Sequence, residues 1–222
     1  MNRICALTAR LVAVAATVSS VSPVGAAEQA IKAPAPAVLA PVSGHRETAI
    51  FTGGCFWGVE GVFSHVNGVL SATSGYTGGT ADTADYETVS TGTTGHAESV
   101  KVVFDPTRVN YADLLRIYFS VVANPTLLNR QGPDRGTQYR SALFPMSAAQ
   151  DKVARAYIAQ LSNAHVYSGP IVTRIEVSRI FYPAEVHHQD FMARNPTYPY
   201  IVVNDRPKVE ALRRLFPAHW KA

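Results

Sequence analysis

Cys55 is the residue of this sequence best suited to covalent chemistry, and it stands in the run GGCFWGVE at positions 53–60. The apolar residues 48–51 before it predict a short strand, which the glycine pair ends. Apolar side chains then recur at helical spacing, at Phe56, Val59 and Phe63. We therefore expect the cysteine in the first turn of a helix, where free backbone N–H groups and the helix dipole favour an anion. A thiol in that place is expected to shift toward thiolate, its nucleophilic form.

Two large aromatic residues, Phe56 and Trp57, follow the cysteine directly. Aromatic residues at the exposed start of a helix suit the walls of an apolar pocket beside the sulfur. The alternative is a buried, inert cysteine in a strand-to-helix turn, with both aromatics in the core, because free cysteine is often simply buried. The spacing alone leaves both interpretations open.

Further polar candidates lie in or beside two long predicted loops, residues 75–95 and 124–138. Loops of that length in a compact domain are usually functional or disordered. Tyr86 belongs to the first loop, Asp134 to the second, and Tyr139 directly follows it. Glu98 stands near the start of a predicted strand, residues 96–104. Taken singly, each has an ordinary alternative: a solvated carboxylate, a packed tyrosine ring, or an aspartate that forms a turn.

The remaining pattern interleaves strands with helices. Strands are predicted at residues 69–73, 139–144 and 171–177, in addition to the two above. Helices are predicted at residues 111–121, 147–161, 184–193 and 204–216. Helices covering one sheet make an α+β fold, which we predict to be a two-layer α/β sandwich with a ferredoxin-like core and long functional loops.

The first 27 residues have the plan of a secretory signal peptide: a basic start, a short apolar middle and small residues at positions 24–27. Retention as an uncleaved anchor is the alternative. We therefore expect an exported, periplasmic protein. Residues 28–45 are rich in alanine and proline and predict an extended tether. The catalytic domain is then expected to occupy residues 46–222.

Loss of that signal peptide would change both the charge and the cysteine count. The formal charge would fall from +4 to +2, and no basic run with interleaved aromatics supports nucleic-acid binding. Cys5 would leave, so Cys55 would be the single cysteine of the mature chain. A single cysteine in an exported protein indicates a reactive thiol or an intermolecular bridge. It also excludes zinc sites built on paired cysteines.

Five motifs in order resemble those of the peptide methionine sulfoxide reductases of the A type. They are GGCFWGVE at 53–60, GYTGG at 75–79, TGHAE at 94–98, GTQYRS at 136–141, and YPAE at 182–185 with HQD at 188–190. The resemblance covers roughly residues 45–216. Each motif alone is weak, but five in order are highly specific.

The resemblance implies a role for each candidate. Cys55 would be the nucleophile, and Phe56 with Trp57 would hold the methyl group of methionine S-sulfoxide. Glu98 would be the acid. Tyr86 and Tyr139 would hydrogen-bond the sulfoxide oxygen, with Asp134 supporting them through water. Substrates would be oxidised methionine residues in proteins and free methionine sulfoxide, and the activity would be protein repair under oxidative stress.

The chemistry of the reaction agrees with these residue types. A sulfoxide oxygen leaves sulfur poorly unless it is protonated, so the site needs a carboxylic acid that stays neutral near pH 7. Burial beside aromatic rings would raise the pKa of a glutamate in that direction. Phenol donors would stabilise charge on the oxygen. Cys55 would be left as a sulfenic acid, which a thiol can reduce.

The chain departs from the family pattern at several positions, namely Ala123, Asn124, Pro133 and Ser90. No resolving cysteine stands near the C-terminus, so the reductive half of the cycle must use an external thiol. The candidates are a thioredoxin-like protein, glutaredoxin with glutathione, or dithiothreitol in vitro. We expect no bound cofactor, no metal and a monomer.

Two other function classes deserve a test. A cysteine hydrolase could use Cys55 with His96 as its base. A non-catalytic module could bind oxidised peptides with Cys55 inert. A metal site at Glu185 and His188, three residues apart on a predicted helix, lacks a third ligand at metal spacing.

Overall fold

The computed structural model describes residues 30–177 and 180–222. The predicted signal peptide, with Cys5, lies outside the described residues. Within them, no helix is long and apolar enough to cross a membrane.

A mixed sheet forms the centre of the domain, in the strand order β7-β6-β1-β3-β2-β8. Neighbouring strands are antiparallel except for the parallel pair β6 and β7. The strand bounds are β1 Glu47–Thr52, β2 Val69–Thr77, β3 Ala97–Phe104, β6 Ala142–Phe144, β7 Arg174–Ile175 and β8 Tyr182–Pro183. A separate small hairpin pairs β4, Arg130–Gln131, with β5, Asp134–Arg135.

Two crossover helices join the inner strands. Helix α1, Phe56–Ser64, connects β1 to β2, and helix α3, Tyr111–Ile117, leads from β3 toward β6 through a π-helical turn, Tyr118–Val122. With the inner order β6-β1-β3-β2, this is the β-α-β-β-α-β arrangement of ferredoxin-like folds. The predicted α+β class is confirmed.

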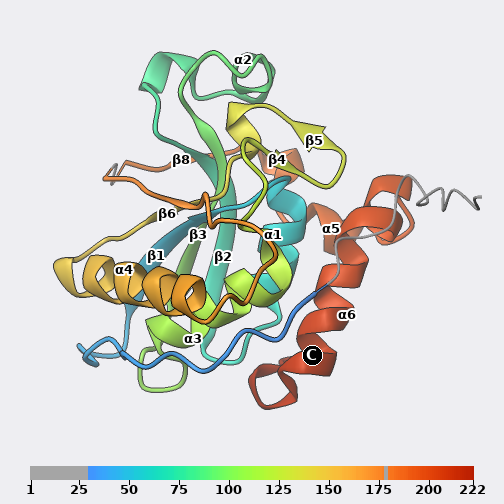
Figure 1. Cartoon of the computed structure of the whole chain (residues 1–222). Coiled ribbons are helices and arrows are strands. Elements are labelled where there is room, and N and C mark those ends of the chain that lie inside the picture. Colours follow the sequence, from blue (N-terminus) through green and yellow to red (C-terminus); the bar gives the residue numbers. More distant parts are fainter. Residues whose placement is uncertain (1–29, 178–179) are drawn as a thin grey trace, which may run out of the picture.

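All the longer helices lie on one side of the sheet, as Figure 1 shows for α1, α3 and α4. One core cluster joins strand residues such as Phe51 and Val102 to α1, α3, α4 (Ala148–Asn163) and α6 (Arg206–Leu215). Because side chains alternate along a strand, Ile50 and Phe144 face the other side, where Phe181 packs on them. The sheet therefore has one thick, helix-covered face, and Glu98 shares this face with Val100 and Val102.

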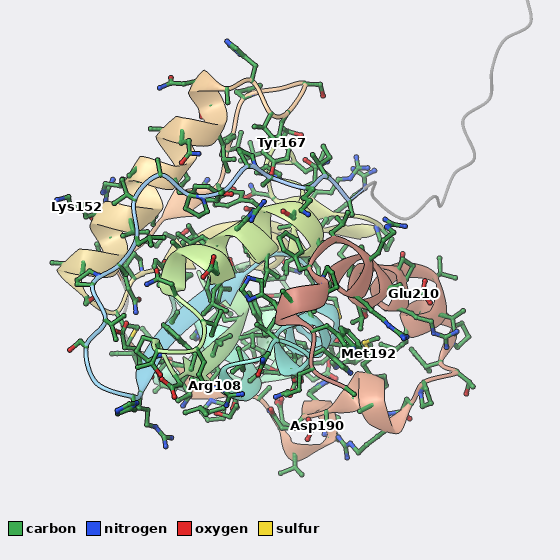
Figure 2. All side chains as sticks on the ribbon, turned by 90° about the horizontal axis from the view of Figure 1, so that it is seen from below. Arg108, Lys152, Tyr167, Asp190, Met192 and Glu210 are labelled. Atoms are coloured by element: carbon green, nitrogen blue, oxygen red, sulfur yellow. The ribbon has the colours of Figure 1, made fainter. Side chains whose placement is uncertain are left out.

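Residues 30–43 form no helix or strand, yet they differ from the free tether predicted for this stretch. Ala33 is fully buried. Arg116 of α3 donates to the carbonyl of Ala33, and Tyr157 of α4 donates to that of Pro34, each at 2.8 Å. Figure 2 shows this segment crossing the lower face of the domain. The chain thus packs on the domain well before residue 45.

Several elements begin or end at residues other than those predicted, because strand pairing in the sheet overrides the local secondary-structure propensity. The motif at 75–77 is not loop but the end of β2, where Tyr76 pairs with Glu98 of β3. Within the predicted loop 75–95, residues Tyr86–Ser90 form helix α2, whose N-cap Asp85 accepts from the N–H of Thr88.

Three further predictions are corrected at the C-terminal side. The strand predicted at 139–144 begins only at Ala142, because residues Thr137–Tyr139 form a 3₁₀ turn. The strand at 171–177 is reduced to β7. The helix predicted at 184–193 is instead a 3₁₀ turn at Val186–His188 and the short helix α5, Phe191–Arg194, which follow strand β8. The proline that suggested a helix start lies at the edge of the sheet, where its missing N–H is tolerated.

Candidate active site

Cys55 is the N-cap of helix α1 rather than a member of its first turn. The approach to it requires glycine, since Gly54 has a φ of +85° and a Cβ there would lie 2.6 Å from Cβ of Gln131. Gln131 in turn holds the backbone of Asn124 with both ends of its amide, at 2.9 and 3.0 Å. The turn that carries the cysteine is thus fixed by the β4–β5 hairpin.

Glu98 projects from β3 toward the same helix end. Its side chain is buried, and its Oε2 accepts a hydrogen bond from the backbone N–H of Phe56 at 3.0 Å. Burial raises the pKa of Glu98 to about 8, and the nearby Asp134 and Asp205 add to this rise, while the hydrogen bond from Phe56 opposes it. A carboxyl group with that pKa is mostly protonated at pH 7. Glu98 can therefore donate a proton at neutral pH.

The thiol of Cys55 departs from the sequence-based expectation. Burial raises its pKa well above the ordinary value, and Glu98 and Asp205 raise it further. The backbone N–H of Trp57 lowers the pKa of Cys55, as expected for a helix end, but this effect is smaller than that of burial and the nearby acids. The predicted shift toward thiolate is therefore wrong for the resting site, because burial and nearby acids outweigh the helix terminus.

An aromatic wall stands beside the sulfur. The ring of Phe56 is buried, with the rings of Tyr86 and Trp57 each 6.4 Å away between centroids. Trp57 is partly exposed, stacks on Phe191 at 3.9 Å, and donates from Nε1 to Nδ1 of His188 at 3.2 Å. These contacts hold Trp57 in one orientation. The wall therefore presents aromatic, largely apolar surface.

Tyr86 and Tyr139 lie near the thiol and the acid. Burial raises the pKa of Tyr86 to about 12, and Glu98 and Cys55 raise it further. The pKa of Tyr139 is also raised by burial and then by the charge of Glu98. Both phenols therefore keep their protons at neutral pH and can donate hydrogen bonds. Glu185 fixes Tyr86 by accepting from its backbone N–H at 2.9 Å.

Asp134 meets a partner that the sequence analysis missed. Its carboxylate accepts a hydrogen bond from the hydroxyl of Tyr200, whose ring meets Trp57 edge-on at 6.0 Å. Burial raises the pKa of Asp134, while the hydrogen bond from Tyr200 lowers it. Tyr200 therefore joins the C-terminal part of the chain to the site. Its nearest sequence signal is the motif NPTYPY at 195–200, which carries no catalytic pattern of its own.

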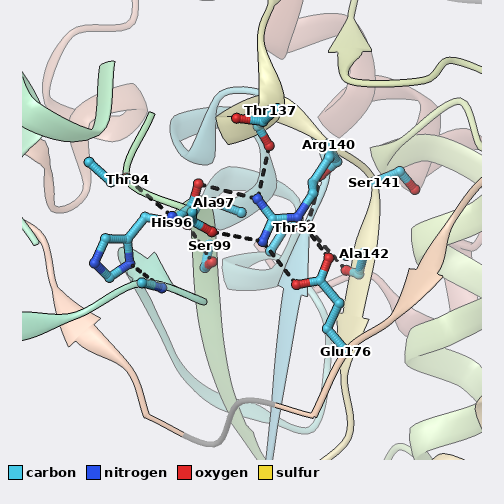
Figure 3. Close-up of polar contacts among 12 residues, drawn as sticks. Thr52, Thr94, His96, Ala97, Ser99, Thr137, Arg140, Ser141, Ala142 and Glu176 are labelled. Carbon is cyan, nitrogen blue, oxygen red and sulfur yellow. Dashed lines mark hydrogen bonds and ion pairs between the residues drawn. The ribbon is translucent and has the colours of Figure 1, made fainter. Parts of the chain in front are cut away.

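Arg140, all of whose N–H groups donate hydrogen bonds, positions the segments that carry the site residues. It donates two hydrogen bonds to Glu176, at 2.8 and 2.9 Å. Its other donors reach the carbonyls of Gly95, His96 and Thr137 (Figure 3). These bonds tie the start of β3, which carries Glu98, to the turn that carries Tyr139. We call this group, Arg140 with Glu176 and the three carbonyls, the arginine anchor.

An open pocket of about 730 Å³ adjoins the arginine anchor rather than Cys55. Its lining includes Arg140, Arg174 and Glu176. The five N–H donors of Arg140 are all used within the chain. The buried cation therefore has no donor left for a ligand.

His96 is occupied elsewhere and does not serve Cys55. Its Nδ1 accepts from the N–H of Gly79 at 3.2 Å, and its Nε2 donates to the carbonyl of Thr80 at 2.9 Å. A base with both ring nitrogens bonded to backbone cannot take a proton from the thiol. This removes the Cys55–His96 pair that the hydrolase alternative requires.

Glu185 and His188, the other cluster singled out in the sequence, also have structural partners. Oε2 of Glu185 accepts from the hydroxyl of Tyr76 at 2.8 Å, and it lies 4.0 Å from Nε2 of His188. In the described part of the chain, no group of three or more His, Cys, Asp or Glu residues is placed to hold a metal ion.

Three of the four positions that depart from the family pattern have clear places in the structure. The side chain of Asn124 accepts from the backbone N–H of Thr126 at 3.0 Å and forms a turn below the hairpin. Pro133 stands in the tight link between β4 and β5, directly before Asp134. Ser90 ends helix α2, and its carbonyl accepts from Gln138 at 3.1 Å. None of the three displaces the hydrogen bond between Asp134 and Tyr200.

Comparisons with known proteins agree with this geometry. A family model described as peptide methionine sulfoxide reductase matches residues 47–219. A "Peptide methionine sulfoxide reductase MsrA 2" from Mesorhizobium japonicum is 63% identical over 172 residues, which cover 78% of this chain and 88% of that protein. Another protein of the same name, from Synechocystis, is 49% identical over 79% of this chain and 82% of its own length.

Solved structures resemble the fold as well. Methionine sulfoxide reductase A of Corynebacterium diphtheriae has a TM-score of 0.59 and 30% identity, covering 80% of this chain and 89% of that chain. Mxr1 from Saccharomyces cerevisiae in reduced form has a TM-score of 0.62 and 28% identity, covering 71% of this chain and 91% of that chain.

Proposed function

This chain belongs to the peptide methionine sulfoxide reductase family and is a peptide-methionine (S)-S-oxide reductase, and we propose that Cys55 and Glu98 carry out its chemistry. The observation that supports these roles most strongly is the buried Glu98, held neutral at the helix end beside the thiol. A neutral acid and a nucleophilic sulfur within one aromatic wall are what sulfoxide reduction requires.

In the proposed complex, the sulfoxide methyl group packs against Phe56 and Trp57. The sulfoxide oxygen then points toward the carboxyl group of Glu98 and the hydroxyls of Tyr86 and Tyr139. Phenols that keep their protons stabilise the charge on that oxygen without reorganisation. Asp134 supports this pair through water while Tyr200 holds its carboxylate.

The chemical step moves one oxygen atom from the substrate to the enzyme. Glu98 protonates the sulfoxide oxygen as the sulfur of Cys55 attacks the sulfoxide sulfur. The sulfur–oxygen bond of the substrate breaks, and the oxygen passes as hydroxide to the sulfur of Cys55. The transient bond between the two sulfur atoms breaks in the same step, so methionine leaves as the thioether and Cys55 becomes a sulfenic acid. The substrate is reduced by two electrons and the thiol is oxidised by two. The thiol proton returns to Glu98, so the acid is regenerated.

The reductive half uses an external thiol. Cys55 is the free cysteine of the described residues, and the C-terminal residues pack against His65 at the far end of α1. An external thiol would attack the sulfenic acid to give a mixed disulfide and water, and a second thiol would release Cys55. A thioredoxin-like protein or glutaredoxin with glutathione fits this role in the cell, and dithiothreitol fits it in vitro.

We further propose that the substrates include both free methionine sulfoxide and oxidised methionine in proteins, that the enzyme is a monomer, and that it is exported to the periplasm. The basic, apolar and small-residue pattern of residues 1–27 supports export. N-terminal sequencing of the protein recovered from the periplasmic fraction tests this directly. Cleavage after Ala26 or Ala27 is expected, whereas an intact Met1 in the membrane fraction would indicate an anchor.

The experiment that tests the catalytic proposal is a single turnover without reductant. Wild-type protein should form one equivalent of methionine and one sulfenic acid at Cys55, seen by mass spectrometry. Cys55→Ser should form no methionine, because the oxygen has no acceptor. A burst that persists in Cys55→Ser would overturn the assignment, and binding of an oxidised peptide without any burst in the wild type would favour a binding module.

A further inference from the structure

Asp205 is a buried acid to which the mechanism gives no task. It ends the π-helical turn Ile201–Asp205 at the start of α6 and has no exposed surface. Neither carboxylate oxygen has a hydrogen-bond partner within the described residues. Its nearest counter-charge is Nζ of Lys208, 3.7 Å from Oδ1. A buried carboxylate with so few partners is costly and calls for an explanation.

The carboxylate lies against the first turn of α1. A Cβ added at Gly58 would lie 2.7 Å from Cγ of Asp205, closer than real side chains approach. Gly58 is three residues after Cys55, so Asp205 reaches the helix end only because residue 58 has no side chain. The first turn of a helix offers unpaired N–H groups and a positive field, which favour an anion. Asp205 therefore places a negative charge against the first turn of the helix that carries Cys55 at its N-cap.

The other charged and titratable groups around the thiol come from several elements. β3 contributes Glu98, the β4–β5 hairpin contributes Asp134, and the remaining groups are the phenols Tyr86, Tyr139 and Tyr200 with the cation Lys208. Burial raises the pKa of Asp205 to about 6, which Lys208 opposes. Asp205 is thus mostly ionised at pH 7, while Glu98 is mostly neutral.

We propose that Asp205 is a positioning residue that keeps Cys55 as the neutral thiol in the resting enzyme, because its carboxylate lies against the first turn of α1 and opposes a second negative charge on the sulfur. This rests on Cys55 being the reactive thiol of the proposed function. The thiol then retains its proton until a sulfoxide is bound. It is also less open to other electrophiles and oxidants, since the thiolate is the form that reacts with them.

The test is alkylation of reduced, full-length protein with iodoacetamide between pH 5 and 10, with the Cys55 peptide followed by mass spectrometry. Asp205→Asn removes the charge and keeps the shape. It should move the midpoint of alkylation to lower pH by about one unit and raise the rate at pH 7 roughly tenfold. Glu210→Gln, on the exposed face of α6, is the matched control and should leave the profile unchanged.

A second measurement needs no variant. In the wild type, protonation of Asp205 below about pH 6 should ease ionisation of the thiol. The logarithm of the alkylation rate should therefore fall by less than one per pH unit there, and by a full unit in a folded Asp205→Asn protein. A slope of one in the wild type throughout this range would overturn the proposal, as would superimposable profiles for wild type and Asp205→Asn. Methionine formation in a single turnover is measured separately, so failure here would leave the proposed reaction standing.

Discussion

Two groups of buried charges lie close together in this domain and are built in opposite ways. The arginine anchor satisfies every donor of Arg140 with a carboxylate or a carbonyl. The acid cluster, which we define as Glu98, Asp134 and Asp205, gathers like charges with few partners, and burial raises the pKa of all three. Paired charges hold segments in place, whereas unpaired acids gain unusual protonation states. The anchor is therefore structural, whereas the cluster carries the proposed chemistry.

The two groups meet on the same segments. Glu98 follows Gly95 and His96, whose carbonyls the anchor holds, and Tyr139 directly precedes Arg140. Figure 3 shows these segments drawn together by Arg140. The anchor thus fixes the positions of Glu98 and Tyr139, the proposed acid and phenol donor.

The largest expected effect separates the acid cluster from ordinary surface acids. Glu98→Gln keeps the shape but removes the transferable proton, so we expect the single-turnover rate to fall by about 10²–10⁴-fold with the fold intact. Glu87→Gln, an exposed acid on α2, should change the rate less than twofold. Stopped-flow detection of methionine formation checks both. A Glu98→Gln enzyme at the wild-type rate would remove Glu98 from the acid role.

The next effect tests the anchor. Arg140→Met leaves Glu176 and three carbonyls without their partner, and Glu176 is partly exposed, so water can compensate in part. We expect the free energy of unfolding to fall by roughly 2–4 kcal/mol in urea titrations. Arg155→Met, which breaks an exposed pair with Asp151, is the control and should cost less than about 1 kcal/mol. Equal losses from the two variants would show that the anchor does not differ from a surface pair.

The smallest effect concerns Tyr200. Tyr200→Phe removes the hydroxyl that holds Asp134 but keeps the ring against Trp57. We expect a loss of about threefold to tenfold in kcat/KM, equivalent to the roughly 1 kcal/mol that one ordinary hydrogen bond contributes. Tyr198→Phe, whose ring also meets Trp57 edge-on, is the matched control. If Tyr198→Phe lost as much activity, the loss would not be specific to the hydroxyl that holds Asp134.

The sequence predicted the inner sheet, α1 and the cysteine turn because local signals coincide there: an apolar strand, a glycine pair and helical spacing. It also named Glu98, Tyr86, Tyr139 and Asp134 as site residues through the family resemblance, and the structure brings them to the end of α1 near Cys55. It placed Tyr76 in a loop, because the pairing of Tyr76 with Glu98 depends on a partner strand more than twenty residues away.

Other features escaped because they depend on burial, which a linear pattern does not show. The pKa of Cys55 follows from its burial and from acids on three distant segments, so the helix-terminus argument gave the wrong direction. Asp205 can lie against α1 only because residue 58 is a glycine, and 147 positions separate the two residues in the chain. The helix predicted at 184–193 failed for a similar reason, since Tyr182 and Pro183 pair with β2.

The protonation state of Glu98 tests the central claim most directly. Infrared difference spectra of wild type and Glu98→Gln, recorded from pH 5 to 10, report the C=O stretch of a protonated carboxylic acid. Because the raised pKa lies at about 8, the band assigned to Glu98 should be present at pH 7 and disappear with a midpoint near pH 8. Asp205 and Glu60, which are stronger acids than Glu98, should lose theirs near pH 6. If the pH 7 spectra of wild type and Glu98→Gln showed the same carboxylic-acid bands, Glu98 would already be ionised at pH 7. That result would contradict the proposed acid.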